Sequence, residues 1–174
     1  MRETKKAILE LEDGTVFEGK SFGFEKACSG EVVFNTAMTG YPESLTDPSY
    51  EGQVLVTTFP LIGNYGVPPK EEQDGVARYF ESSRIHCEAI VCQDYSWEYS
   101  HWLAEESLSD WLKREQVVGV YGIDTRALTK LLREKGSMLG RIFIEGAEKP
   151  EFYDPNKENL VAKVSCKEVE TYGD

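Results

Sequence analysis

The sequence predicts a mixed α/β domain, and three of its features carry that prediction. Short apolar runs of strand length recur through the first half of the chain. Two amphipathic helical patterns alternate with apolar runs between about residues 85 and 144. The length of 174 residues and the hydrophobic content of 40% suit one domain with a substantial core.

The first half is expected to consist of antiparallel strands. A hairpin opens the chain, because residues 7–11 and 15–19 flank an Asp13-Gly14 turn that suits the twist of paired strands. Further strands are predicted at 31–35 and 53–59. The polar loop between them is long, and ordering it costs about 1–2 kcal/mol per residue in backbone entropy. The sequence therefore indicates that this loop has a function.

The second half is expected to alternate strands with helices. Strands are predicted at 85–92, 117–123 and 139–144, with a helix in each of the two intervals. Because strands joined by helices usually run in the same direction, this order favours parallel pairing throughout the half.

Each predicted helix has a capping signal. Ser107 with Asp110 has the form of a capping box, and Asp124 is expected to cap a helix that ends at Gly136. The residues expected on the buried faces are Leu108, Trp111 and Leu112 in the first helix, and Ala127, Leu128, Leu131 and Leu132 in the second.

Charge and hydropathy exclude several classes of protein. Nineteen Lys and Arg residues against 31 Asp and Glu residues give a net charge of −12, which disfavours nucleic-acid binding. No apolar run approaches the roughly 20 residues that cross a bilayer, and the charged start has no signal-peptide core. These features predict a cytoplasmic protein.

The four cysteines are predicted to be free thiols, since they form no CxxC pair. A metal site from His86, Cys87 and Cys92 is disfavoured. In a strand, Cys87 would point to the face opposite to both His86 and Cys92. The sequence predicts no metal site.

No residue of the chain is predicted to be catalytic. His86 and His101 are the only candidate imidazole bases, and no Gly-x-Ser-x-Gly or Gly-x-Cys-x-Gly elbow presents a nucleophile. The glycine-rich nucleotide motifs are also missing, so no cofactor is expected in this chain.

Two aromatic-tipped loops and one polar turn remain as candidates for a binding face. Thr39-Gly40-Tyr41 and Asn64-Tyr65 each follow a predicted strand. With Asp47-Pro48-Ser49-Tyr50 they offer small polar groups beside rigid aromatic surface, a combination suited to a protein partner or a small ligand. The residue pattern does not choose between these two.

At these residues the chain resembles the N-terminal domain of the small, glutaminase subunit of carbamoyl-phosphate synthase. The resemblance extends in order over about residues 7–144, and residues 159–166 resemble the family's interdomain connector. The segments that carry it are 11–15, 30–36, 38–41, 45–50, 60–66, 122–129 and 132–136.

The resemblance implies a three-layer β/β/α domain of the swivelling type, with mixed sheets, over residues 1–145. Residues 146–174, which are polar with only Leu160, Val161 and Val164 as apolar anchors, would then be a connector. This connector would lead to a C-terminal class I glutamine amidotransferase domain that is absent from the sequence.

The family's reaction implies the partners of this chain. The amidotransferase domain releases ammonia from glutamine, and a large subunit uses it with ATP, a divalent metal and bicarbonate to make carbamoyl phosphate for arginine and pyrimidine biosynthesis. The resemblance thus implies a heterodimer in which this domain docks the small subunit onto the large one and is itself inactive.

The resemblance also implies roles for individual residues. Ser49 corresponds to the family's glutamine contact from this domain, and Thr39, Gly40, Tyr41, Asn64 and Tyr65 are the candidates for the interface. The chain departs from the family pattern at Cys87, Glu88, Cys92 and Gln93, and at Tyr41-Pro42, where Tyr-Gln is commoner. The alternative is a stand-alone protein-binding module that kept the fold without a role in the enzyme.

Overall fold

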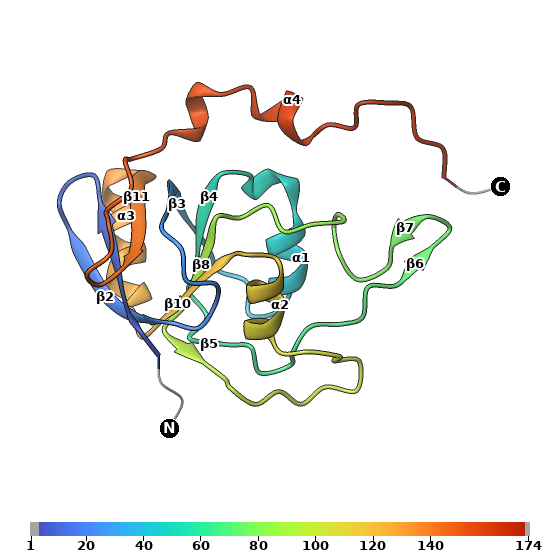
Figure 1. The fold of residues 1–174 in the computed structure, drawn as a ribbon, viewed down its shortest axis with the longest axis horizontal. Coiled ribbons are helices and arrows are strands. Elements are labelled where there is room, and N and C mark those ends of the chain that lie inside the picture. The colour runs from blue at the N-terminus through green and yellow to red at the C-terminus, as the bar shows by residue number, and fades with distance from the viewer. Residues whose placement is uncertain (1–3, 173–174) are drawn as a thin grey trace.

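The computed structural model describes residues 4–172, and it confirms the mixed α/β class. Seven strands form a closed barrel in the order β1-β11-β3-β4-β8-β10-β2 (Figure 1). Their bounds are β1 Lys6–Leu11, β2 Val16–Ser21, β3 Cys28–Asn35, β4 Gln53–Thr57, β8 Ala89–Val91, β10 Val118–Tyr121 and β11 Met138–Ile144.

The remaining elements lie outside the barrel. The short strands β5 (Leu61–Ile62) and β9 (Asp94–Tyr95) pair with each other, as do β6 (Glu72–Gln73) and β7 (Val76–Ala77). The helices are α1 Tyr41–Thr46, α2 Leu108–Arg114, α3 Thr125–Lys135 and α4 Leu160–Val164, with 3-10 turns η1 Pro48–Tyr50 and η2 Pro155–Lys157. No helix within residues 4–172 has the length and apolar character needed to cross a membrane.

The N-terminal hairpin is confirmed. Strands β1 and β2 pair antiparallel, and Gly14 takes the positive φ of 86° that the turn requires. The backbone N–H of Thr15 donates to the Asp13 carboxylate at 2.9 Å, which fixes the turn locally.

The predicted strand directions are partly wrong. The parallel pair β8–β10 is confirmed, but β3 and β4, expected to be antiparallel, pair parallel with Glu31 opposite Gln53. The reason is that residues 36–52 are not only loop: they contain α1, and a helical crossover returns the chain in its starting direction. Strand β11, expected to be parallel, runs antiparallel to both β1 and β3, between which it closes the barrel.

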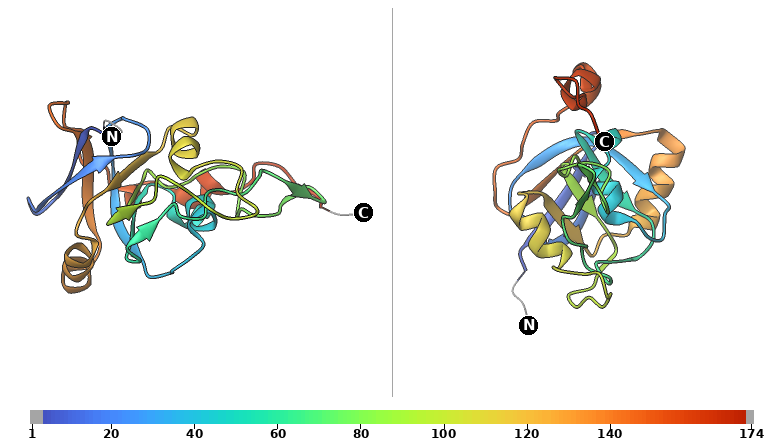
Figure 2. Two further views of the ribbon diagram at one scale, coloured as in Figure 1. Left: turned by 90° about the horizontal axis from the view of Figure 1, so that it is seen from below. Right: turned by 90° about the vertical axis from the view of Figure 1, so that its right-hand side faces the viewer.

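Two hydrophobic cores lie on opposite faces of the parallel strands. Val54 and Val56 of β4 belong to the core inside the barrel, which also takes Leu128 and Leu132 of α3. Leu55, between them, belongs to a second core built with Leu45 of α1 and Trp111 of α2. Figure 2 shows α2 and α3 on different sides of the barrel, as this division requires.

Both helix caps are confirmed. Ser107 Oγ accepts from the N–H of Asp110 at 3.1 Å, and Asp124 Oδ1 accepts from the N–H of Ala127 at 2.8 Å. The expected burial of Ala127 is wrong: this side chain is exposed, whereas Leu128 and Leu132 are buried and Leu131 is half-buried. A small residue at the edge of the apolar stripe is the one that reaches solvent.

The strand expected at 85–92 is shorter than predicted, since only Ala89–Val91 pair as β8. Alternation of faces therefore does not extend back to Cys87. The expectation that Cys87 and Cys92 face opposite ways is wrong, because both lie in the second core.

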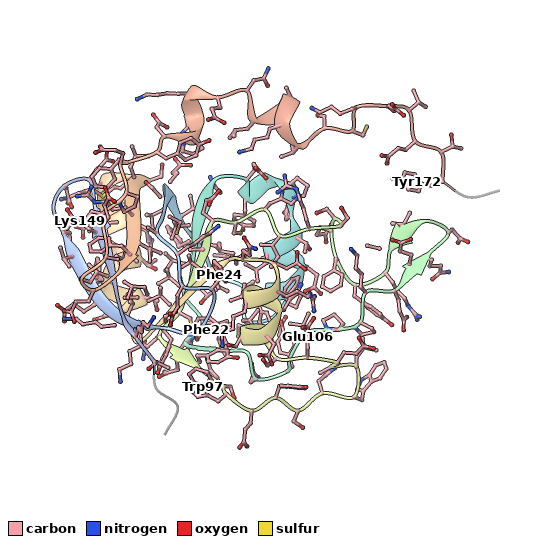
Figure 3. All side chains as sticks on the ribbon, viewed as in Figure 1. Phe22, Phe24, Trp97, Glu106, Lys149 and Tyr172 are labelled. Atoms are coloured by element: carbon pink, nitrogen blue, oxygen red, sulfur yellow. The ribbon has the colours of Figure 1, made fainter. Side chains whose placement is uncertain are left out.

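The connector, residues 146–172, runs along one end of the molecule above β3, β4 and α1 (Figure 1). Of its three expected apolar anchors, Leu160 and Val164 are half-buried, and only Val161 is exposed. Val161 is 73% exposed, whereas Pro155 is buried. Near its end, Tyr172 approaches the turn between β6 and β7, 3.4 Å from the place of a Cβ on Gly75 (Figure 3).

Candidate functional site

The candidate site is built on the crossover between the parallel strands β3 and β4. Asn35, the last residue of β3, organises its start: Oδ1 accepts from the N–H of Ala37 at 2.7 Å. Asn35 Nδ2 lies 3.2 Å from the Tyr50 hydroxyl and 3.3 Å from Ser44 Oγ. One amide therefore joins the end of the strand to both α1 and η1.

Ser49 lies at the centre of η1, a turn that its own sequence specifies. Asp47 caps the turn by accepting from the N–H of Ser49 at 2.8 Å, and Pro48 supplies the fixed φ of the first position. Ser49 is exposed, and its hydroxyl makes no hydrogen bond within residues 4–172. The turn thus holds the backbone and leaves the hydroxyl available to a ligand.

The two aromatic-tipped loops form one structure. The Tyr65 hydroxyl accepts from the N–H groups of Gly40 and Tyr41 at 2.7 and 3.1 Å, and the Tyr41 hydroxyl donates to the carbonyl of Gly66 at 2.6 Å. The two tyrosine rings stack with centroids 4.3 Å apart. Gly40 has a φ of 83°, so glycine suits this position at the start of α1.

The five interface candidates differ in exposure. Thr39 and Asn64 are exposed, while Gly40 and Tyr65 are half-buried. Tyr41 is only 4% exposed, and burial raises the pKa of its hydroxyl above the usual value. Tyr41 therefore acts inside the domain by holding the two loops together.

A groove of about 400 Å³ lies where these loops meet the segment that precedes α2. Thr39, Gly40 and Tyr65 line one side, and Tyr79 and His101 line another. The His101 ring stands edge-on to Tyr65 at 6.3 Å between centroids. Next to His101, Trp102 is 86% exposed. His101 was not predicted as a site residue, although the His101-Trp102 pair is a signal of exposed aromatic surface.

A buried polar cluster lies directly after η1, centred on Glu51, whose side chain is 5% exposed. Glu51 Oε2 accepts from His86 Nδ1 at 2.6 Å and from the Arg84 guanidinium at 2.9 Å. Glu51 Oε1 pairs with Lys163 Nζ of α4 at 3.1 Å. We call Glu51, Arg84, His86 and Lys163 the Glu51 cluster.

The Glu51 cluster keeps its central carboxylate ionised. Burial by itself raises the pKa of Glu51, but hydrogen bonds from His86 and Lys163, together with the charge of Arg84, outweigh it and lower the pKa below 4.5. Glu51 was not predicted as a site residue, because its partners are distant in sequence and no local pattern joins them.

The Glu51 cluster also touches a serine, but the geometry does not support hydrolysis. His86 Nε2 lies 3.0 Å from Ser82 Oγ, which resembles the order of a catalytic triad. The hydroxyl of Ser82, however, donates to the carbonyl of Thr46 at 2.6 Å. With that proton directed to the carbonyl of Thr46, the Ser82 hydroxyl is not placed to give it up to His86.

The buried thiols offer no nucleophile. Cys28, Cys87 and Cys92 are buried and free, whereas Cys166 is exposed. Burial raises the pKa of Cys28 to about 12 and raises those of Cys87 and Cys92 as well, which disfavours the reactive thiolate. Within residues 4–172, no three His, Cys, Asp or Glu side chains gather as a metal site would require.

Comparison with known families gives one match that covers most of the chain. Residues 9–142 match the model described as carbamoyl-phosphate synthase small chain, CPSase domain.

Three curated proteins illustrate the similarity. "Multifunctional protein pyr1-3" of Dictyostelium discoideum is 56% identical over 97% of this chain and 8% of its own length. "Carbamoyl phosphate synthase arginine-specific small chain" of Eremothecium gossypii is 54% identical over 95% of this chain and 42% of its own. "Carbamoyl-phosphate synthase [ammonia], mitochondrial" of Homo sapiens is 50% identical over 96% of this chain and 11% of its own. The chain thus spans less than half the length of each of these relatives.

Among solved structures, an "Aminopeptidase from Aneurinibacillus sp. strain AM-1" aligns with a TM-score of 0.42 and 15% identity, over 85% of this chain and 32% of that one. A score this low does not establish a shared fold.

Proposed function

The chain belongs to the carbamoyl-phosphate synthase small-chain family, and we propose that it is the non-catalytic domain that docks a glutaminase onto a carbamoyl-phosphate synthetase and borders the glutamine pocket. Residues 1–145 are the proposed docking domain. Residues 146–174 are the proposed connector to an amidotransferase domain. ATP and a divalent metal act on the synthetase part.

One observation carries the proposal: the exposed hydroxyl of Ser49 on a preorganised turn. Asp47 and Pro48 fix the backbone of η1, so the hydroxyl can orient a substrate without taking part in bond making. A single hydroxyl is suited to bind the amide or carboxylate of glutamine.

The docking surface in this proposal is the groove beside the two tyrosine-linked loops. Thr39 and Tyr65 border it, and Met38 nearby is 69% exposed. Exposed methionine and aromatic side chains are enriched in protein interfaces. The partner is a large subunit in a heterodimer, or a later part of the same polypeptide, as the 8% coverage of the longer relatives suggests.

The three-layer β/β/α arrangement of the swivelling type belongs to the same proposal. It is supported by the two cores on opposite faces of β4, one closed by strands and one covered by α1 and α2. A cytoplasmic location and a role in arginine or pyrimidine biosynthesis remain predictions.

The test compares two nitrogen donors in the full-length protein with its synthetase part. Ser49→Ala is expected to raise the KM for glutamine about 2- to 10-fold, the equivalent of one net hydrogen bond of about 0.5–1.5 kcal/mol. Synthesis from ammonia should be unchanged, because ammonia bypasses the glutamine pocket. Ser83→Ala is the matched control, since Ser83 is also exposed and its side chain makes no hydrogen bond within residues 4–172.

Equal loss with both nitrogen donors would assign Ser49 a structural role instead. The human relative, named for ammonia, raises a second candidate: a synthase domain that serves ammonia alone. That candidate requires the unaltered full-length protein to make carbamoyl phosphate from ammonia and not from glutamine. A stand-alone binding module, the third possibility, would give neither activity.

A further inference from the structure

The connector is fastened to the barrel at its start. The Arg141 guanidinium of β11 donates to the carbonyl of Pro150 at 2.9 Å and lies over the Phe152 ring, 4.5 Å from its centroid. The N–H of Tyr153 then donates to the buried Ser29 hydroxyl of β3 at 2.8 Å. These contacts hold the first third of the connector against the sheet.

A second fastening lies at Gly52, the residue before β4. Gly52 has a φ of 75°, and a Cβ placed on it would lie 2.9 Å from Pro155 Cβ and 3.5 Å from Tyr153 Cε1. The connector therefore packs directly on the backbone of Gly52, where glycine alone leaves enough room.

The third fastening is the ion pair between Glu51 and Lys163. His86 and Arg84 both bind Glu51 Oε2, so Lys163 Nζ at 3.1 Å is the cation on the other oxygen. A buried carboxylate with one oxygen unpaired is costly, which gives α4 a defined place on the domain.

The second and third fastenings, at Gly52 and Glu51, are close in sequence to the turn that presents Ser49. Glu51 and Gly52 follow Ser49 by two and three residues, and the N–H of Glu51 donates to the carbonyl of Pro48 at 3.2 Å. The residues that Lys163 and Pro155 contact therefore lie at most three positions after Ser49 in the sequence.

We propose that Glu51 and Lys163 are positioning residues whose ion pair fixes the connector relative to Ser49. The polypeptide after the connector then begins from a defined place, so that its glutamine site closes on the Ser49 hydroxyl in one geometry. This inference rests on the proposed function, and it adds that the connector works as a rigid strap rather than as a flexible linker.

The experiment uses the full-length protein with its synthetase part. Lys163→Met keeps the length of the side chain and removes its charge. It is expected to raise the KM for glutamine about 2- to 5-fold, which is the loss of affinity that one half-exposed ion pair would account for. The kcat with glutamine and the synthesis from ammonia should stay within error of the unaltered protein.

Two further variants make the result specific. Lys163→Arg keeps the charge and should restore the KM for glutamine. Lys157→Met is the matched control, because Lys157 is a connector lysine that is 81% exposed and 3.8 Å from its partner Asp154, and it should have no effect.

Three outcomes overturn the inference. An unchanged KM in Lys163→Met shows that the ion pair does not position the site. An equal loss with glutamine and ammonia shows a structural role. A KM that rises equally in Lys157→Met shows a general effect of connector charge.

If Ser49→Ala also leaves the KM unchanged, the proposed function itself fails. If Ser49→Ala raises it and Lys163→Met does not, only the strap is wrong.

Discussion

At the scale of single residues, the environment of a side chain decides its role more than its type does. Tyr41 and Tyr65 look equivalent in sequence, but Tyr41 is 4% exposed and bonds inward to Gly66, whereas Tyr65 also borders the groove. Among the glutamates, Glu51 is buried among cations, while Glu72 is exposed on β6. The burial of a side chain and the groups it contacts, rather than its residue type, therefore decide its role.

The depressed pKa of Glu51 predicts a dependence of stability on pH. Its contribution is fully present above the usual pKa of 4.5 and is lost as the pH falls through the lower folded value. Glu51→Gln should lower the free energy of unfolding by about 1.5–3 kcal/mol at pH 7, the worth of a charged hydrogen-bond partner.

Denaturant unfolding of the purified protein at pH 7 and at pH 3 measures this effect. The difference between Glu51→Gln and the unaltered protein should shrink at the lower pH. Glu72→Gln, at an exposed position with no ion pair to any residue of 4–172, is the control and should unfold as the unaltered protein does. A deficit of the same size at both pH values would contradict the assigned ionisation.

At the scale of elements, local signals predicted helix starts better than strand directions. The caps of α2 and α3 depend on residues three apart, and both formed as expected. Helix α1 was not predicted, although Pro42 and Glu43 in its first turn are signals of a helix start. With six residues, α1 is too short to show an apolar period, and its omission led to the wrong direction for β4.

The N-cap of α3 predicts how much one capping residue contributes to the stability of the domain. Asp124→Ala removes the acceptor of the Ala127 N–H and should destabilise the domain by about 0.5–2 kcal/mol. Arg126→Ala, an exposed change in the same turn, should cost much less. The urea midpoint of the two variants provides the comparison, and equal midpoints would show that the cap contributes nothing.

At the scale of the whole molecule, the connector packs against one end of the barrel. The connector crosses the end of the molecule at which the parallel strands β3 and β4 both begin (Figure 1). Its contacts reach Ser29 of β3, Gly52 before β4 and the Glu51 cluster. The end that carries Ser49 is therefore also the end along which the connector is fastened to the barrel.

Gly52→Ala tests this arrangement. The added Cβ would collide with Pro155, so the connector should lift and become a preferred site for limited proteolysis within residues 146–172. Gly14→Ala is the matched control, because Gly14 has a similar φ of 86° but its Cβ position has no neighbouring atom of residues 4–172 within 4 Å. Equal rates of connector cleavage in the two variants would show that backbone strain, and not the lost packing, is responsible.

The sequence by itself determined what depends on neighbouring residues and on family motifs. The hairpin at Gly14, the caps at Ser107 and Asp124 and the membership of the carbamoyl-phosphate synthase small-chain family are of this kind. Each depends on hydrogen bonds or side-chain patterns that span only a few residues. These features can therefore be predicted from the amino-acid sequence alone.

The tertiary structure alone decided what depends on contacts between distant segments. Closure of the barrel sets β11 antiparallel between β1 and β3, and the packing of two cores buries Tyr41 and exposes Ala127. The Glu51 cluster joins η1, the segment before β8 and the connector. Local sequence does not specify such pairings, because the free energy that selects them comes from burying surfaces that meet only in the folded chain.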